Sequence, residues 1–423
     1  MALMNPPLKT PKTTLLPPQA PVSPSHGSSS NSPSSRSKPI PYTGSPLALC
    51  ASDIRLFFQN AWSIPGIMRP IHSASPTPLD ELYPSGPNIL ALVLHAFLLV
   101  FEAGFLVSLP LLAFVPVWAG AIYLVVVGAV VWDVSGALNG TVDTKLSSKV
   151  RLEEREVRGT AGECWVYLNG VSIGHHWMQS NLDRLSYTFR RPIIGVHNRT
   201  YGIIFDLIQC IIERNFCYAT ADIRRSYAVI REKLLDPKYT KLILIAHSQG
   251  GIEGSLILDW LLGELPQDII HKLEIYTFGS AANHFNNPLR ESKSENSAHA
   301  YAVRHIEHYT HAGEFVARWG AITFSRMENR YMGRIFIQPG SGHLLNQHYL
   351  TDMFPLDKNM RVVEENKFMN MPVEIPSHRI ANGNTKDTEV ESLLDGVEGN
   401  TAGSTVKDFS RLWGYRNGRT PAD

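Results

Sequence analysis

One long apolar segment constrains the fold of this chain more than any other feature. Residues 89–132 contain a single charged side chain, that of Glu102. A bilayer core about 30 Å thick is crossed by about 20 helical residues. The segments 89–109 and 111–132 each reach that length, and Pro110 between them would end or kink a helix. The run predicts a two-helix membrane hairpin, either spanning or re-entrant. The alternative is a buried hairpin of a soluble protein, but soluble helices usually carry a polar face.

The charges on either side of this hairpin predict its orientation. A hairpin leaves both flanking segments on one side of the membrane. Both flanks are basic, through Arg55 and Arg69 before the hairpin and Lys145, Lys149 and Arg151 after it. Because basic flanks stay in the cytosol, we expect a multi-pass membrane protein with two helices in the bilayer and its folded domain in the cytosol. The bilayer is then a partner, while the organelle and any protein partner are left open.

Composition excludes several other classes of protein. The formal net charge is +1, whereas nucleic-acid-binding proteins usually carry a strongly basic patch, so we expect no nucleic-acid partner. The four cysteines have no C-x-x-C spacing, and the histidines form no H-E-x-x-H motif. We therefore expect neither a disulfide-stapled scaffold nor a metal site. No cofactor is implied.

Both ends of the chain are biased in composition. Residues 1–50 hold eleven prolines, ten serines and no acidic residue, and such a segment buries too little apolar surface to fold. Residues 371–423 are rich in Gly, Asn, Thr, Ser and acidic residues. We predict a disordered tail at each end. Within the second tail, the block DFSRLWGYR at 408–416 is either a docking motif or a chance cluster, and we favour chance.

Residues 160–357 have the pattern of an α/β domain. Short apolar runs typical of strands occur at 165–171, 192–198, 241–247, 272–280, 300–309 and 333–340. Amphipathic stretches typical of helices lie between them, at 175–189, 202–213, 219–235 and 251–263. Because buried parallel strands are apolar throughout rather than alternating, this order predicts a mostly parallel central sheet with helices on both faces.

The fourth helical stretch follows a motif that positions a nucleophile. The apolar run 241–247 leads into Ala246-His247-Ser248-Gln249-Gly250, and a helix follows directly. A serine on a strained strand-to-helix turn needs small residues two positions before and two after it, and Ala246 and Gly250 meet that need. The turn would also place the backbone N–H of Gln249 beside a developing oxyanion. We therefore predict that Ser248 is a catalytic nucleophile.

A nucleophilic serine needs a base, and the base needs an acid that orients it. On this type of sheet the acid follows a late strand and the base follows the last one. Glu314 lies in the loop after the strand at 300–309 and is our candidate acid, with Glu307 inside that strand as second choice. His343 follows the Gly-rich turn after the last strand and is our candidate base. His348, five residues on, is the alternative base.

A second oxyanion donor is expected from the loop after an early central strand. That loop is 168–174, and its two glycines, Gly170 and Gly174, permit a close approach of backbone. Our candidate for the second donor is the N–H of Val171.

Together these motifs resemble the α/β-hydrolase superfamily over about residues 160–357. AHSQGG after an apolar strand, LNGV before a helix and GSGH after the last strand carry the resemblance. The Ala-x-Ser-x-Gly form is similar to that of small bacterial triacylglycerol lipases. Longer stretches, such as WVYLNGVSIGHHWMQSNLDRL, resemble a group of functionally uncharacterised fungal α/β-hydrolase-like proteins. The resemblance implies a triad of Ser248, Glu314 and His343, with Glu in place of the commoner Asp, and no established substrate.

These observations favour a membrane-anchored serine hydrolase of the lipase or esterase type. It would form an acyl-enzyme on a carboxylic ester or thioester, and the membrane hairpin favours a lipidic substrate. Two alternatives stay open at this stage. One is a catalytically silent membrane scaffold on the same fold, and the other is an acyltransferase that uses the same triad.

Overall fold

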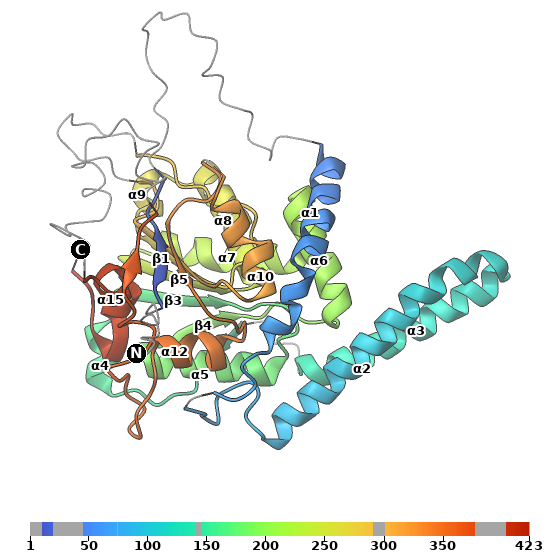
Figure 1. The fold of residues 1–423 in the computed structure, drawn as a ribbon, viewed down its shortest axis with the longest axis horizontal. Helices are drawn as coiled ribbons and strands as arrows, with labels where there is room; N and C mark the ends of the chain where they lie inside the picture. Colours follow the sequence, from blue (N-terminus) through green and yellow to red (C-terminus); the bar gives the residue numbers. More distant parts are fainter. Residues whose placement is uncertain are drawn as a thin grey trace, which may run out of the picture.

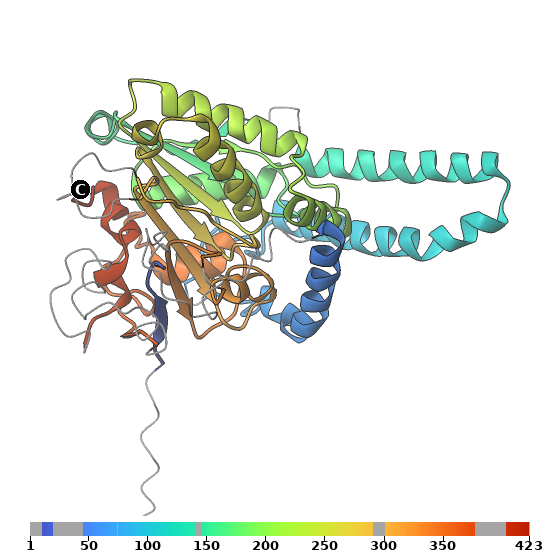
Figure 2. The same ribbon diagram turned by 90° about the horizontal axis from the view of Figure 1, so that it is seen from above.

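The chain folds around one large sheet with helices on both faces (Figure 1). The computed structural model describes residues 11–19, 45–73, 75–140, 145–290, 301–327, 329–376 and 403–422. The prediction of a mixed α/β fold with a mostly parallel central sheet is confirmed, because six consecutive strands of the sheet run in the same direction. Two apolar helices project from this body as a hairpin (Figure 2).

The sheet has nine strands in the order β2-β4-β3-β5-β6-β7-β8-β1-β9. The parallel strands are β3 (Glu163–Leu168), β4 (Ile193–Val196), β5 (Lys241–His247), β6 (Leu273–Phe278), β7 (His305–His311) and β8 (Arg334–Gln338). The remaining strands lie toward the two edges of the sheet: β2 (Lys145–Ser147) at one edge, and β1 (Thr13–Leu16) and β9 (Val373–Glu374) at the other. β2 is antiparallel to β4 and β1 is antiparallel to β8. Each of the six strands predicted from the sequence corresponds to one of the six parallel strands.

Two apolar cores lie on opposite faces of the sheet, as the alternation of side chains along a strand requires. In β3, Trp165 and Tyr167 belong to one core and Val166 and Leu168 to the other. The first core is covered by α5 (His175–Phe189) and the second by α6 (Ile203–Phe216), α7 (Ala221–Leu235) and α8 (Gln249–Glu264). The remaining short helices are α4 (Glu154–Gly159), α9 (Gln267–Ile270), α10 (Phe315–Trp319), α11 (Ala321–Phe324), η4 (Leu345–Leu350) and α12 (Thr351–Met353).

The projecting hairpin consists of α2 (Gly86–Ser108), η3 (Leu109–Phe114) and α3 (Val117–Asn139). Both arms are long and apolar enough to cross a membrane, and most of their side chains are exposed. Pro110 lies inside the turn η3, where we predicted the break between the two helices. The hairpin begins earlier and ends later than the predicted boundaries of 89 and 132, and the added turns carry Asn88 and Asn139, whose side chains contact the domain.

Polar side chains fix the base of the hairpin to the domain. The carboxylate of Glu102 accepts a hydrogen bond from the backbone N–H of Ile204 at 2.9 Å, in the first turn of α6. Asn88 accepts from the indole N–H of Trp177 at 2.9 Å, and Asn139 donates to a carbonyl in the loop before α6 at 2.7 Å. The acidic residue of the apolar segment thus satisfies free N–H groups at a helix N-terminus.

The prediction of a disordered segment over residues 1–50 is wrong for its two described parts. Residues 13–16 form β1, which inserts between β8 and β9, with Leu15 fully buried. Residues 46–50 open α1 (Pro46–Asn60), which continues into η2 (Ala61–Ile67). The short TTLL stretch gains a strand partner on each side, and average composition does not reveal such pairing.

The prediction of a disordered tail over 371–423 is also wrong for the described residues, which are 371–376 and 403–422. They form β9, α15 (Val406–Phe409) and η5 (Leu412–Gly418). The aromatic side chains of the 408–416 block enter the first core: Phe409, Trp413 and Tyr415 are all buried there. This block is therefore a docking segment and not a chance cluster.

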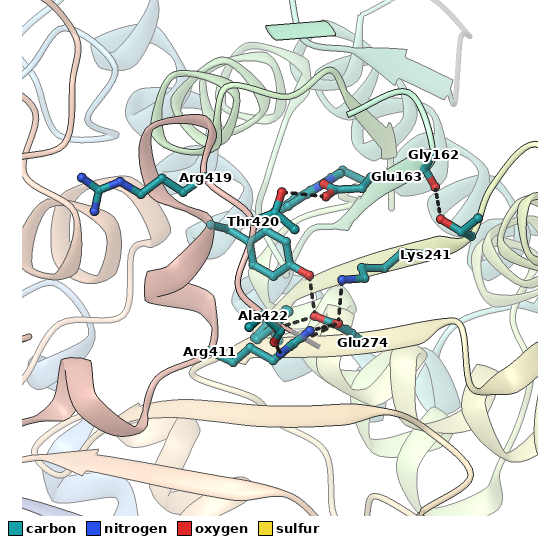
Figure 3. A network of polar contacts seen from close by, with 12 residues as sticks. Gly162, Glu163, Lys241, Glu274, Arg411, Arg419, Thr420 and Ala422 are labelled. Carbon is teal, nitrogen blue, oxygen red and sulfur yellow. Dashed lines mark hydrogen bonds and ion pairs between the residues drawn. The ribbon is translucent and has the colours of Figure 1, made fainter. Parts of the chain in front are cut away.

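A polar network secures this C-terminal segment to the N-terminal ends of the strands (Figure 3). Arg411 donates to the buried carboxylate of Glu274 on β6 at 3.0 Å, and Lys241 on β5 lies 3.6 Å from the same carboxylate. The pKa of Glu274 lies below its usual value, because the hydrogen bond and charge of Arg411 and the charge of Lys241 outweigh the effect of burial. Thr420 donates to Glu163 on β3 at 3.3 Å.

Candidate active site

Ser248 lies on a strained turn between β5 and α8. Its φ of +57° belongs to the left-handed region that L-residues rarely adopt, and its N–H donates to the carbonyl of Phe278 at 3.0 Å. The turn requires Gly250, where a Cβ would lie 2.5 Å from the carbonyl oxygen of Leu168. Strain of this kind is retained where the surroundings fix it, and it is common at functional sites. Ser248 is 2% exposed.

The loop after β3 lies directly against Ser248. A Cβ on Gly170 would lie 2.4 Å from Cβ and 3.0 Å from Oγ of Ser248, so only glycine fits there. Asn169 holds this loop by donating to the carbonyl of Asn198 at 2.9 Å, and Ser172 N–H donates to a carboxylate of α6 at 2.9 Å. The loop that carries Val171 is thus fixed beside Ser248 through its neighbours on either side.

His343 and Glu314 lie together beside this turn. Nδ1 of His343 is 3.3 Å from Oε2 of Glu314, which is ion-pair distance. The angle does not make a hydrogen bond, and neither ring nitrogen of His343 has a hydrogen-bond partner among the described residues. The ring lies against Gly279, where a Cβ would be 2.7 Å from it. Gly279 follows Phe278, which accepts the Ser248 N–H, so the three predicted residues form one cluster.

Backbone N–H groups of the helix that follows it hold the Glu314 carboxylate in place. It is fully buried and caps α10, accepting from Val316 N–H at 2.6 Å and Ala317 N–H at 2.8 Å. The hydroxyl of Tyr349 donates to it at 3.4 Å. These donors fix the position of the carboxylate next to the imidazole, as an orienting acid requires.

The alternative base, His348, is engaged elsewhere. Its Nε2 donates to the carbonyl of Pro70 at 2.9 Å and its Nδ1 accepts from Leu344 N–H at 3.0 Å. Burial lowers the pKa of His348 to about 4, so the ring is neutral at pH 7. The neighbouring His247 donates from Nε2 to the carbonyl of His343 at 2.7 Å. Both rings support the loop of His343, and among these three histidines His343 is the one with both ring nitrogens uncommitted.

The second-choice acid, Glu307, does not lie at this site. Its carboxylate accepts from the hydroxyl of Tyr309 at 2.5 Å and from the N–H of Arg411 at 2.8 Å, so it belongs to the anchor of the C-terminal segment. Within the described residues there is no cluster of three or more His, Cys, Asp or Glu that could hold a metal ion. A surface hollow lined by Tyr227 and Glu264 lies at the far ends of α7 and α8, away from Ser248.

Residues 61–71, which we call the clasp, pass over the loops of the acid and the base. The carbonyl of Ile67 accepts the N–H of His343 at 2.9 Å, and that of Gly66 accepts the N–H of Gly342 at 2.7 Å. Gly66 packs so closely on the acid loop that a Cβ would lie 2.1 Å from the carbonyl oxygen of Gly313. No motif marks these residues, because their role lies in backbone groups that any sequence supplies.

Two buried acids in other parts of the chain support the same cluster, and no sequence pattern indicated either of them. Glu81 accepts the N–H groups of Asn346 and Gln347 at 3.0 Å each and so fixes the turn after His343. Glu213 on α6 accepts from the side chain of Gln249 at 3.0 Å. Burial raises the pKa of each of these two carboxyls to about 7.

Comparison with known proteins adds no relative: no family model matches the chain, and no curated protein sequence is similar enough to match. The chemistry must therefore be argued from the geometry. The cluster offers a hydroxyl on a strained turn, an imidazole with free nitrogens, a fixed carboxylate and backbone N–H groups beside the hydroxyl. These are the parts of nucleophilic acyl transfer.

Proposed function

We propose that this protein is a membrane-anchored serine hydrolase of the α/β-hydrolase type, which cleaves a carboxylic ester of a lipid. The observation that carries the proposal is the strained Ser248 turn, with φ of +57°, next to the His343–Glu314 pair at 3.3 Å. The order serine, acid, histidine along the chain is that of the α/β-hydrolase template.

The reaction has two steps with one base. His343 takes the proton of Ser248 Oγ while Oγ attacks the ester carbonyl, and the oxyanion receives hydrogen bonds from the N–H groups of Gln249 and Val171. The C–O bond to the alcohol breaks, and the alcohol leaves with the proton from His343. Water then attacks the acyl-enzyme, His343 accepts its proton and returns it to Ser248, and the free acid leaves.

The lipid substrate is supported by where the hairpin joins the domain. Ser248 follows the carboxyl end of β5, and α6, whose first-turn N–H of Ile204 donates to Glu102, follows the carboxyl end of β4. Parallel strands end at the same edge of a sheet, so the hairpin and the site share that edge. A bilayer around the hairpin would bring ester lipids to this edge, with the folded domain in the cytosol.

Two other functions remain as outcomes of the test. An acyltransferase would form the same acyl-enzyme and pass the acyl group to another acceptor. A silent scaffold would keep the fold without an activated serine. The buried state of Ser248 requires an opening movement before a lipid enters, and this requirement is common to both enzymes.

A fluorophosphonate probe tests the proposal on detergent-solubilised full-length protein. We expect the wild type to be labelled, and Ser248→Ala and His343→Ala to lose the label. His348→Ala is the matched control, because that ring is committed to Pro70 and Leu344, and it should retain labelling. A folded wild type that does not react supports the scaffold instead. A labelled enzyme that releases no free acid from ester lipids, but transfers acyl groups, is an acyltransferase.

A further inference from the structure

An apolar stripe on α1 and η2 faces away from the protein. Leu47, Ile54 and Phe58 lie on one side of α1, and Trp62 continues the stripe into η2. Phe58 is 71% exposed and Trp62 is 65% exposed. The opposite side of α1 is fixed: Asp53 is buried and pairs with the buried Arg214 of α6. The exposed stripe therefore belongs to a rigidly held helix.

The neighbouring helix α6 extends this apolar surface. Ile208, Ile212 and Phe216, at positions i, i+4 and i+8, are each at least 40% exposed and so share one face of the helix. α1 and α6 pack against each other, and α6 also packs against α2. Both views show α1 and α6 at the root of the hairpin, crossing its direction (Figures 1 and 2). We call the exposed apolar residues of α1, η2 and α6 the plate; they lie on packed helices at the root of the hairpin.

The length of hairpin beyond this plate is limited. Glu102 is bonded to the first turn of α6, and twelve residues separate it from the end of η3 at Phe114. At 1.5 Å per residue these span about 18 Å, whereas a bilayer core is about 30 Å thick. When the plate lies on the membrane surface, the tip of the hairpin therefore lies inside the hydrocarbon core.

The tip has the composition of a segment that stays in hydrocarbon. Residues 109–119, LPLLAFVPVWA, contain no charged residue and no residue with a polar side chain other than the indole of Trp118. Pro110 and Pro116 lack an N–H, which removes two donors that would otherwise need partners in lipid. The hydroxyl of Ser108 is bonded to the carbonyl of Phe105 and to the hydroxyl of Tyr123. A turn that emerged into water would have no need of these features.

We propose that the face formed by Leu47, Ile54, Phe58 and Trp62 of α1–η2 and Ile208, Ile212 and Phe216 of α6 lies on a lipid surface. The hairpin then enters the hydrocarbon core and turns back within it, without crossing the bilayer. This inference rests on the membrane anchoring of the proposed function and deepens it. The clasp, which begins with η2 and holds the His343 loop, lies at the lipid boundary, so lipid has direct access to the segment that covers the triad.

Depth-dependent fluorescence quenching tests this arrangement in full-length protein. A bimane fluorophore is placed on single cysteines, Phe114→Cys, Phe58→Cys or Leu235→Cys, in a background with Cys50→Ser and Cys217→Ser. The protein is bound to sealed phosphatidylcholine vesicles that carry nitroxide either at the headgroup or deep in the acyl chain. Leu235 is the matched control, because it is exposed like Phe58 but lies at the opposite end of the domain, just before β5.

We expect the deep nitroxide to quench bimane at position 114 most strongly, and the headgroup nitroxide to quench it most strongly at position 58. Bimane at position 235 should lose no fluorescence to either. Quenching of position 114 by iodide trapped inside the vesicles would show a hairpin that crosses the bilayer and would overturn the inference. Equal, weak quenching at positions 58 and 235 would also overturn it. If the protein does not float with vesicles, membrane anchoring itself fails, while fluorophosphonate labelling in detergent tests the hydrolase chemistry separately.

Discussion

Replacement of Gly170 by alanine is the sharpest test of the geometry around Ser248. The new Cβ would lie 2.4 Å from the Ser248 Cβ and 3.2 Å from the carbonyl oxygen of His247. An ordinary contact is at least 3.4 Å, so the loop after β3 or the serine must move by about 1 Å. A displacement of that size at reacting groups costs about 100-fold in rate, similar to the loss of one oxyanion donor. We expect Gly170→Ala to slow fluorophosphonate labelling by about that factor.

Gly254→Ala is the matched control for this substitution. Gly254 lies in α8, two turns after Ser248, and its nearest neighbour would be the Ala246 Cβ at 3.8 Å, which is an ordinary contact. Alanine inside a helix is more favourable than glycine by about 0.5–1 kcal/mol, so this variant should melt slightly higher and label at the wild-type rate. The second-order rate constant and the melting temperature are measured for both variants. Wild-type labelling by a folded Gly170→Ala would refute the argument that this loop bounds the reacting groups.

Three further predictions concern stability. Asp53→Ala leaves the buried Arg214 without its carboxylate, which should cost about 3–5 kcal/mol in urea unfolding. Arg411→Ala removes the main partner of the buried Glu274, and because a lysine remains nearby we expect a smaller loss of about 2 kcal/mol. Burial raises the pKa of Glu213 from 4.5 to about 7. The unfolded chain then releases this proton first, so this group should lower the free energy of unfolding by roughly 3 kcal/mol between pH 4.5 and 7, with no further change above. Glu213→Gln should remove this share of the slope and leave the share of Glu81, whose pKa is also raised to about 7.

The first two substitutions each have a control on the same chain. Asp268→Ala breaks an exposed pair with Arg290 and should cost less than about 1 kcal/mol. Arg419→Ala breaks an exposed pair with Glu364, near Arg411 in the chain, and should behave likewise. Equal losses in Asp53→Ala and Asp268→Ala would contradict the account of the buried anchor. An unchanged pH slope in Glu213→Gln would show that another group titrates there.

Local patterns were sufficient to predict the parallel strands and the cluster of Ser248, Glu314 and His343. The strands are continuous apolar runs, and each of the three residues lies within five residues of the carboxyl end of one. A strand-to-helix turn with small residues around Ser248 is set by near neighbours in the sequence. The structure places these residues together because the ends of neighbouring parallel strands meet at one edge of the sheet.

Contacts between segments that are distant in the sequence could not be predicted from local patterns, for a physical reason. The C-terminal block is held by Glu274 and Glu307, which lie more than 100 residues before it and accept hydrogen bonds from the side chain and the backbone N–H of Arg411. The clasp acts through carbonyls at Gly66 and Ile67, and carbonyl groups have no sequence pattern. Composition alone therefore predicted disorder at both ends, where β1 and the C-terminal aromatics complete the fold.

Trapping an acyl-enzyme on Ser248 tests the central claim most directly. The full-length protein is mixed with a phospholipid in vesicles, quenched in acid within seconds and digested, and the peptides are analysed by mass spectrometry. The account predicts an acyl group on the peptide that contains Ser248 in the wild type, and no such adduct in Ser248→Ala or His343→Ala. It also predicts a burst of released alcohol equal to the enzyme concentration when deacylation is the slower step. Hydrolysis of the lipid that persists in Ser248→Ala, or an acyl group found on another residue, would contradict it.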